Sequence, residues 1–309
     1  MILYVRGNLL QSPAQVLVNT VNTVGAMGRG IALDFKRLFP EMYREYRELC
    51  ERGQFRIGML WLYKSPNKWV LNFPTKEHWR NPSRVEYIDA GLRKFAGSYA
   101  NLGIHSTAFP ALGCGNGQLD FETQVKPLME KYLRPLPIEV FVYPSRKSVF
   151  IEHLNPGQMK KWLRSEPTSL PFAEVWGDLG QLLSENGSFR TIARNKPFIA
   201  QVSQDPRGIE IVAAGQRYCI QYETLMAFWQ QLRTHGFSMR HIAPGVDRRM
   251  SYLMSVFAEL DYVTPVHVAD SYDNLQRAVV TGLQVLPSAF SRETQSVPHF
   301  SQLSLLSPV

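Results

Sequence analysis

VLVNTVNTVGAMGRGIA, residues 16–32, is the most informative segment of the sequence for the fold. Residues 16–19 are apolar up to the final Asn, which predicts a short buried strand. Three glycines then lead into residues 31–39, where apolar side chains recur at the helical spacings of three and four. A glycine loop that opens a helix presents backbone N–H groups to an anion, at the positive end of the helix dipole. The stretch therefore predicts a strand, an anion-binding loop and a helix.

The spacing of these glycines matches neither familiar phosphate loop. A dinucleotide-binding loop has the order G-x-G-x-x-G and a P-loop has G-x-x-x-x-G-K-[ST], whereas this loop has G-x-x-G-x-G with Arg29 between the last pair. Glycines alone would equally serve a tight strand-to-helix turn. Asn19 and Asn22 favour a ligand, because amide groups can orient the hydroxyls of a sugar or a carboxamide.

Length and composition exclude several classes of protein. A chain of 309 residues, 45% of them hydrophobic, is long enough for two domains of ordinary size. It contains no run of about 18 apolar residues, so no membrane partner is expected, and its N-terminus does not resemble a secretory signal. Cys50, Cys114 and Cys219 are far apart and odd in number, which fits neither a disulfide framework nor a zinc site. We expect a cytoplasmic protein without a metal.

The positive charge is confined to the first half of the chain. Residues 1–150 carry 20 Lys and Arg against 12 Asp and Glu, a net charge of +8, while residues 151–309 carry 14 of each kind. A basic domain beside a neutral one indicates a polyanionic partner, of which nucleic acid is the commonest. The alternative is that surface Arg residues only keep the domain in solution.

Strand and helix patterns alternate along the first half. Strands are predicted at residues 2–5, 16–19, 58–63, 69–73, 104–109 and 138–143, and helices at 31–50 with a break at Pro40, 83–101 and 121–133. Ser83 with Glu86 predicts a capping box, and Asp120 predicts an N-cap. This order predicts an α/β fold with a mixed central sheet and helices on both faces.

Three loops follow strands of this sheet, at residues 19–30, 72–79 and 110–119. Ligands of such sheets bind at the carboxyl ends of the strands, so the loops are expected to share one cleft. Lys76 in the second loop is either part of that cleft or an ordinary solvated lysine. The third loop has glycine at alternate positions, which suits a backbone wrapped around phosphate oxygens.

Four separated segments resemble one known family. GNLL at 7–10, VNTVNTVGAMGRGIALDFKRLFP at 18–40, NFPTKEHWR at 72–80 and ALGCGNGQLD at 111–120 are similar to the macrodomain family. Within that family they most resemble the DarG-type antitoxins, which are DNA ADP-ribosyl glycohydrolases. The resemblance covers about residues 1–145 and implies a macrodomain that binds ADP-ribose in one cleft.

The resemblance implies where the ligand lies. Asn8 and Leu9 would lie by the adenine, residues 19–31 along the distal ribose and diphosphate, and residues 113–117 over the diphosphate. Asn8 departs from many macrodomains, which have an aspartate there; an amide can still accept a hydrogen bond, but without charge assistance. The implied binding residues are Asn8, Leu9, Asn19, Thr20, Val21, Thr23, Gly25, Met27, Gly28, Arg29, Gly30, Ile31, Pro74, Thr75, Pro110, Gly113, Cys114, Gly115, Asn116 and Gly117.

The implied reaction breaks the N-glycosidic bond between a DNA base and the distal ribose, with no cofactor. The catalytic residues would be Lys76 and Asn22. Lys76 would either attack the anomeric carbon or assist electrostatically, and Asn22 would orient the ribose hydroxyls. Related enzymes that cleave carboxyl esters have an aspartate where this chain has Gly117, which argues against that activity. Single-stranded ADP-ribosylated DNA is the expected substrate, because an unstacked base reaches a cleft at lower cost.

Four regions are expected: a macrodomain at 1–147, a linker at 148–170 with a helix at 157–164, a smaller α+β domain at 171–290 and a disordered tail at 291–309. By resemblance, the second domain would bind a DarT-type toxin, the DNA ADP-ribosyltransferase partner. Residues Gln302–Leu306, QLSLL, resemble the peptide that binds the DNA sliding clamp. The alternatives are a non-catalytic ADP-ribose-binding module, an antitoxin acting only by protein contact, and a second domain that only stabilises or dimerises the first.

Overall fold

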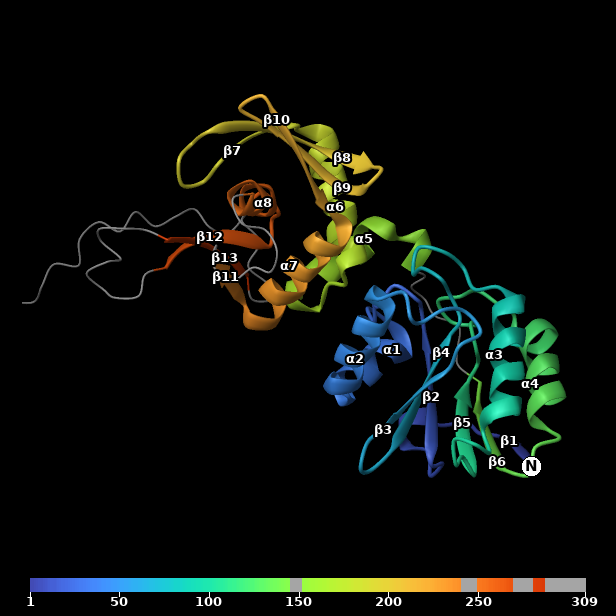
Figure 1. Ribbon diagram of the computed structural model, residues 1–309. Coiled ribbons are helices and arrows are strands. Elements are labelled where there is room, and N and C mark those ends of the chain that lie inside the picture. The colour runs from blue at the N-terminus through green and yellow to red at the C-terminus, as the bar shows by residue number, and fades with distance from the viewer. Residues whose placement is uncertain (145–151, 240–248, 269–279, 287–309) are drawn as a thin grey trace, which may run out of the picture. The chain divides into compact units, whose positions relative to one another are not determined.

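The computed structural model describes residues 1–144, 152–239, 249–268 and 280–286 (Figure 1). The chain divides into two compact units, Met1–Trp162 and Leu163–Val309. The division falls inside the linker expected at 148–170, within the helix α5 (Pro156–Arg164). The tail at 291–309, with the clamp-like peptide Gln302–Leu306, lies outside the described residues, and its role stays a prediction.

The first unit is built on one six-stranded sheet in the order β1-β6-β5-β2-β4-β3. All neighbouring strands are parallel except β3 and β4, which form an antiparallel hairpin because only residues 65–68 join them. The mixed sheet is therefore confirmed. Its strands are β1 (Ile2–Tyr4), β2 (Val16–Val21), β3 (Trp61–Lys64), β4 (Trp69–Pro74), β5 (Ser106–Pro110) and β6 (Glu139–Tyr143).

Helices cover both faces of this sheet, as expected. α1 (Gly30–Leu38) and α2 (Pro40–Glu51) pack on one face, and α3 (Val85–Ser98) and α4 (Lys126–Leu133) on the other (Figure 1). Alternate side chains of β2 enter the two cores, Val16 and Val18 on the α3 side and Leu17 on the α1 side. Burial on both faces explains why β2 is a nearly continuous apolar run.

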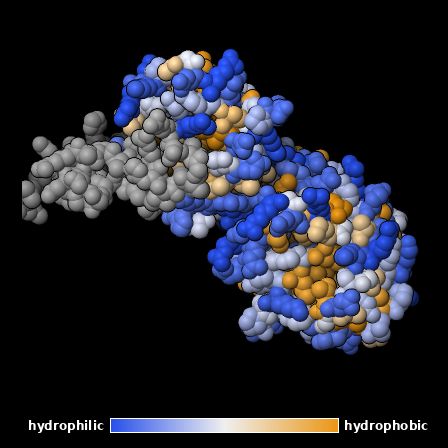
Figure 2. All heavy atoms as spheres, in the orientation of Figure 1, coloured by the Kyte–Doolittle hydropathy of each residue, from blue (hydrophilic) through white to orange (hydrophobic). Residues whose placement is uncertain are grey.

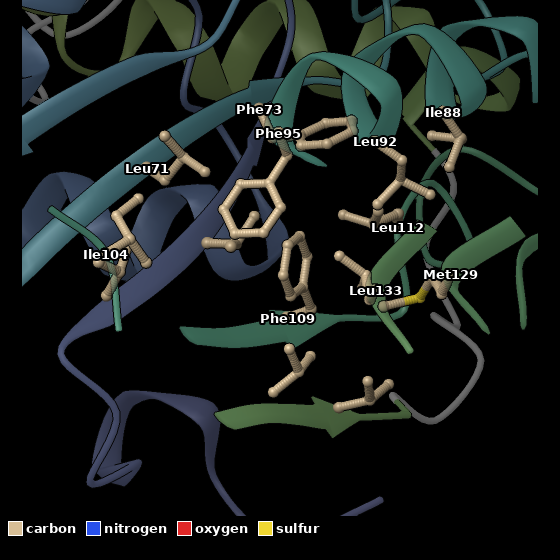
Figure 3. Packing of buried hydrophobic residues seen from close by; sticks show 14 of the residues in the cluster. Leu71, Phe73, Ile88, Leu92, Phe95, Ile104, Phe109, Leu112, Met129 and Leu133 are labelled. Carbon is tan, nitrogen blue, oxygen red and sulfur yellow. The ribbon is translucent and has the colours of Figure 1, made fainter. Parts of the chain in front are cut away.

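Phenylalanine rings pack among aliphatic side chains in the core under α3 (Figure 3). Phe95 of α3 meets Phe109 of β5 edge to face, with ring centroids 5.2 Å apart. Phe73 of β4 lies against Gly91, where a Cβ would overlap its ring. Gly91 therefore lets α3 approach the sheet closely near the carboxyl end of β4.

Helix starts in the first unit differ in part from the sequence pattern. Asp120 caps as expected, because its carboxylate accepts from the N–H of Thr123 at 2.8 Å. The first turns of that predicted helix are a π-helix, Phe121–Val125, before α4 begins. The capping box at Ser83 is wrong: α3 begins after Arg84 without a side-chain cap, and the backbone N–H of Ser83 instead donates to the carbonyl of Gly117.

The second unit contains two antiparallel sheets, β10-β9-β8-β7 and β11-β13-β12. Apolar runs at 198–203, 209–213 and 218–222 and helical patterns at 223–234 and 249–260 predict β8, β9, β10, α7 and α8, but α6 and the other strands were not predicted. Pro171 suggested a linker, yet it is the N-cap of α6, where a missing N–H costs nothing. The bounds are α6 (Phe172–Glu185), β7 (Ser188–Arg190), β8 (Pro197–Gln204), β9 (Arg207–Ala213), β10 (Gln216–Gln221), α7 (Tyr222–His235), β11 (Phe237–Met239), α8 (Met250–Phe257), β12 (Val263–Val268) and β13 (Val280–Val285).

Hydrophilic residues predominate on the face shown in Figure 2, with smaller hydrophobic groups between them. Among the described residues, no helix combines the length and the apolar character needed to cross a membrane. The described residues also contain no cluster of three or more His, Cys, Asp or Glu side chains able to hold a metal ion.

Candidate functional site

One cleft lies where β2, β4 and β5 end, and all three predicted loops contribute to it. These strands are neighbours and run parallel, so their carboxyl ends lie at the same edge of the sheet. Fourteen predicted site residues line the cleft: Thr20, Val21, Asn22, Gly28, Arg29, Gly30, Ile31, Thr75, Lys76, Pro110, Gly113, Gly115, Asn116 and Gly117. Ala26, Ala32 and Ala111 also line it and were not predicted, because a methyl side chain carries no chemical signal.

Asn22 shapes the first loop and faces the cleft. Its Oδ1 accepts from the N–H of Val24 and the N–H of Ala26, at 3.1 and 3.2 Å, and its Nδ2 donates to the carbonyl of Ala26 at 2.6 Å. The hydroxyl of Tyr46, which is fully buried in α2, donates to the backbone carbonyl of Asn22 at 2.6 Å. The loop conformation is therefore held by side-chain bonds from within and by α2 from behind.

Lys76 is the charged side chain that the second loop places in the cleft. Its residue is only 6% exposed, and its Nζ donates to the backbone carbonyl of Asn116 in the third loop, at 2.8 Å. It is therefore not a solvated loop lysine. The amine reaches across the cleft floor and joins the second loop to the third.

Backbone contacts join the second loop to the first. The backbone N–H of Thr23 and its hydroxyl both donate to the carbonyl of Glu77, at 3.1 and 2.9 Å. This pairing holds the loop that carries Lys76 beside the loop that carries Asn22. The predicted residue Thr23 therefore supports the cleft without lining it.

The glycine loop is tightly folded, and only part of it faces open space. Gly113 has a φ of +69°, a conformation that favours glycine. A Cβ on Gly117 would overlap Oγ of Ser83 and the carbonyl of Gly113. A Cβ on Gly115 would meet nothing within 4 Å, so its backbone is the part of the loop most open to a ligand.

Asn19 does not line the cleft, contrary to expectation. The side chain is fully buried, and its Nδ2 donates to Oδ1 of Asn72 at 2.9 Å. The parallel register places these two residues side by side on β2 and β4. Asn19 therefore ties two strands together beneath the loops.

Six further predicted residues also lie outside the cleft lining. Leu9, Met27 and Pro74 are buried in the fold, and Gly25 turns the first loop with a φ of +83° against Arg47. Asn8 caps the short 3₁₀ turn Leu9–Gln11 by accepting from the N–H of Leu10 at 3.0 Å. Burial raises the pKa of Cys114 to about 12, so its thiol is not a nucleophile near neutral pH.

Residues 18–127 match the family model of the Macro domain, over the strands and loops that form this cleft. The first unit contains a macro domain. Over 187 residues the chain is 41% identical to a DNA ADP-ribosyl glycohydrolase of Thermus aquaticus, covering 59% of this chain and 51% of the relative.

A second relative is a DNA ADP-ribosyl transferase-DNA ADP-ribosyl glycohydrolase fusion protein of Thermosipho africanus. It is 37% identical over 172 residues, covering 49% of this chain and 44% of the relative. The solved macrodomain of Mycobacterium tuberculosis DarG is 43% identical, with a TM-score of 0.46, and covers 47% of this chain and 99% of that one. The chain spans about half the length of the curated relatives it matches.

Proposed function

We propose that this protein is a DNA ADP-ribosyl glycohydrolase that removes ADP-ribose from DNA bases. The observation that carries the proposal is the buried amine of Lys76, held 2.8 Å from the Asn116 carbonyl in the shared cleft of a macro domain. The relative at 41% identity has this activity in its name. A module that only bound ADP-ribose would have no need of a buried amine there.

The cleft offers groups for each part of ADP-ribose. Backbone N–H groups at Gly30, where α1 begins, and around Gly115 suit the diphosphate, because the first turn of a helix leaves its N–H groups without intrahelical partners. Asn22 uses one N–H of its amide on Ala26, and the second N–H is the donor we assign to a hydroxyl of the distal ribose.

Bond cleavage builds positive charge on the anomeric carbon and negative charge on the departing base nitrogen. Two roles of Lys76 suit its position. As a neutral amine it would bond to the anomeric carbon while the base leaves and takes up a proton, and water would then release the sugar. As an ammonium it would stabilise or protonate the departing base, with water attacking the anomeric carbon.

Lys76→Ala tests the activity. We expect kcat on an ADP-ribosylated single-stranded oligonucleotide to fall at least a hundredfold, with the affinity for free ADP-ribose changed less than about threefold. Lys64→Ala, at the exposed last residue of β3, is the matched control and should behave as wild type. Full turnover by Lys76→Ala would refute the proposal. Trapping an adduct with cyanoborohydride would select the covalent role, since it reduces an imine between lysine and sugar.

We further propose that the second unit binds a DNA ADP-ribosyltransferase toxin and makes the protein an antitoxin. The support is the relative in which transferase and glycohydrolase are parts of one fusion protein. Lys76→Ala in the full chain separates glycohydrolase activity from inhibition by binding. The variant should still inhibit a DarT-type transferase during the modification reaction, measured as ADP-ribose added to DNA. Loss of inhibition with Lys76→Ala would show that neutralisation is enzymatic only.

A further inference from the structure

A segment that belongs to none of the three loops contacts two of them. His153 lies in the 3₁₀ turn Glu152–Leu154, and its Nε2 lies 2.8 Å from Oε1 of Gln118, just after the glycine loop. Nine residues later, the ring of Trp162 lies under the guanidinium of Arg29, which is 5.6 Å from the ring centroid. Residues 153–162 are therefore held against the first and third loops.

The His153 ring lies near the peptide group that Lys76 binds. Nζ of Lys76 donates to the carbonyl of Asn116, and the backbone of Asn116 is also near enough to the His153 ring to raise its pKa. Burial and the positive charge of Lys76 act more strongly and in the opposite sense, so the pKa of His153 is lowered from its ordinary value of 6.5. At neutral pH the ring is uncharged and accommodates the neighbouring ammonium.

We propose that His153 is a positioning residue of the active site, which holds the third loop for Lys76 through Gln118 while neutral and displaces the amine when protonated. This inference rests on the proposed glycohydrolase function. The mechanism is electrostatic: a second cation beside Asn116 repels the Lys76 ammonium and competes for the same carbonyl. Displacement of a catalytic group by about 1 Å costs as much as a hundredfold in rate.

The surroundings of His153 make the direction of the pH effect clear. The second loop contributes the Lys76 cation, and the third contributes the neutral amide of Gln118 and the Asn116 peptide group. Burial and the Lys76 cation both lower the pKa of the ring, and burial has the larger effect. Protonation of His153 is therefore opposed. As the pH is lowered, kcat is expected to fall, with a midpoint below pH 6.5.

Kinetics of the full chain test the role. His153→Ala should lower kcat about tenfold with KM changed less than twofold, since the ring does not line the cleft. His153→Gln keeps a neutral hydrogen-bonding group; it should restore kcat to within about threefold and abolish the loss of activity below pH 6.5. His105→Gln, on an exposed residue before β5, is the control and should keep the wild-type profile. An unchanged acid limb in His153→Gln would overturn the proposal.

A second measurement does not depend on turnover. The pKa of His153 can be followed by NMR titration of its ring Cε1–H, assigned by comparison with His153→Gln. Lys76→Met removes the cation and keeps an apolar chain of similar length, so the pKa of His153 should rise toward 6.5. An unchanged pKa of His153 in the Lys76→Met protein would refute the coupling between the two side chains. If no variant or wild type turned over the substrate, the proposed function would fail while this titration still decided the coupling.

Discussion

Gly117 and Gly115 are two residues apart in the same loop, but their surroundings differ. A side chain at Gly117 would overlap Ser83 and the carbonyl of Gly113, and the Gly117 carbonyl accepts from the N–H of Ser83 at 3.0 Å. An aspartate at this position would not fit without moving the loop. At Gly115 a methyl group would enter open space that faces the cleft.

Alanine at Gly117 should therefore affect the stability of the protein, whereas alanine at Gly115 should affect ligand binding. Gly117→Ala should lower the free energy of unfolding by about 1–3 kcal/mol through overpacking. Gly115→Ala should leave stability within about 0.5 kcal/mol but weaken ADP-ribose binding about tenfold, because its methyl group occupies the space where the diphosphate meets the backbone. Urea denaturation and calorimetric titration measure the two effects. Equal ligand affinity for Gly115→Ala and wild type would place the diphosphate elsewhere.

Helix α3 holds the sheet through a close contact at one glycine. Gly91 faces the ring of Phe73, whereas Gly97, two turns further along, is exposed and has no atom within 4 Å of an added Cβ. Gly91→Ala should cost about 1–3 kcal/mol of stability, because the helix must move off β4. Gly97→Ala should gain about 0.5–1 kcal/mol from helix propensity. A stable Gly91→Ala protein would mean that Phe73 can turn aside, which a comparison of near-ultraviolet circular dichroism spectra would reveal.

Elements whose own residues carry the signal were predictable from the sequence. The alternation of apolar runs and helical spacings was enough for β1–β6 and α1–α4 of the first unit, and parallel strands require their loops to meet at one edge. The second unit was predicted less well. β7 and β11 are only three residues long, so their patterns are short, and α6 directly follows Pro171 in a stretch that resembles a linker.

Site residues were predictable where the composition of a loop indicated a ligand. They were not predictable where tertiary packing sets the direction of a side chain. Gly113 and Lys76 stand in loops whose composition indicated a ligand, and both line the cleft. Asn19 belongs to the same polar run but points to Asn72, because strand register sets its direction. His153 carried no signal at all, since its neighbours Gln118 and Asn116 lie more than thirty residues away in the chain.

At the scale of the whole molecule, charge and chemistry coincide in one half of the chain. Residues 1–150 carry the entire net charge of +8 and contain the three loops of the cleft, while residues 151–309 are neutral. ADP-ribose itself needs few cations, because backbone N–H groups can hold its diphosphate. The surplus of positive charge therefore suits the strand that carries the modified base, whose phosphates lie beyond the cleft.

This division predicts a difference in salt dependence between two ligands. Two or three contacts to strand phosphates would weaken the binding of an ADP-ribosylated single-stranded oligonucleotide about tenfold between 50 and 200 mM salt, through counterion release. Binding of free ADP-ribose should change much less over the same range. Both affinities are measurable with Lys76→Ala, which leaves the substrate intact during titration. Parallel salt dependence of the two ligands would mean that the protein contacts the ADP-ribose alone, and that the basic surplus has no part in recognising DNA.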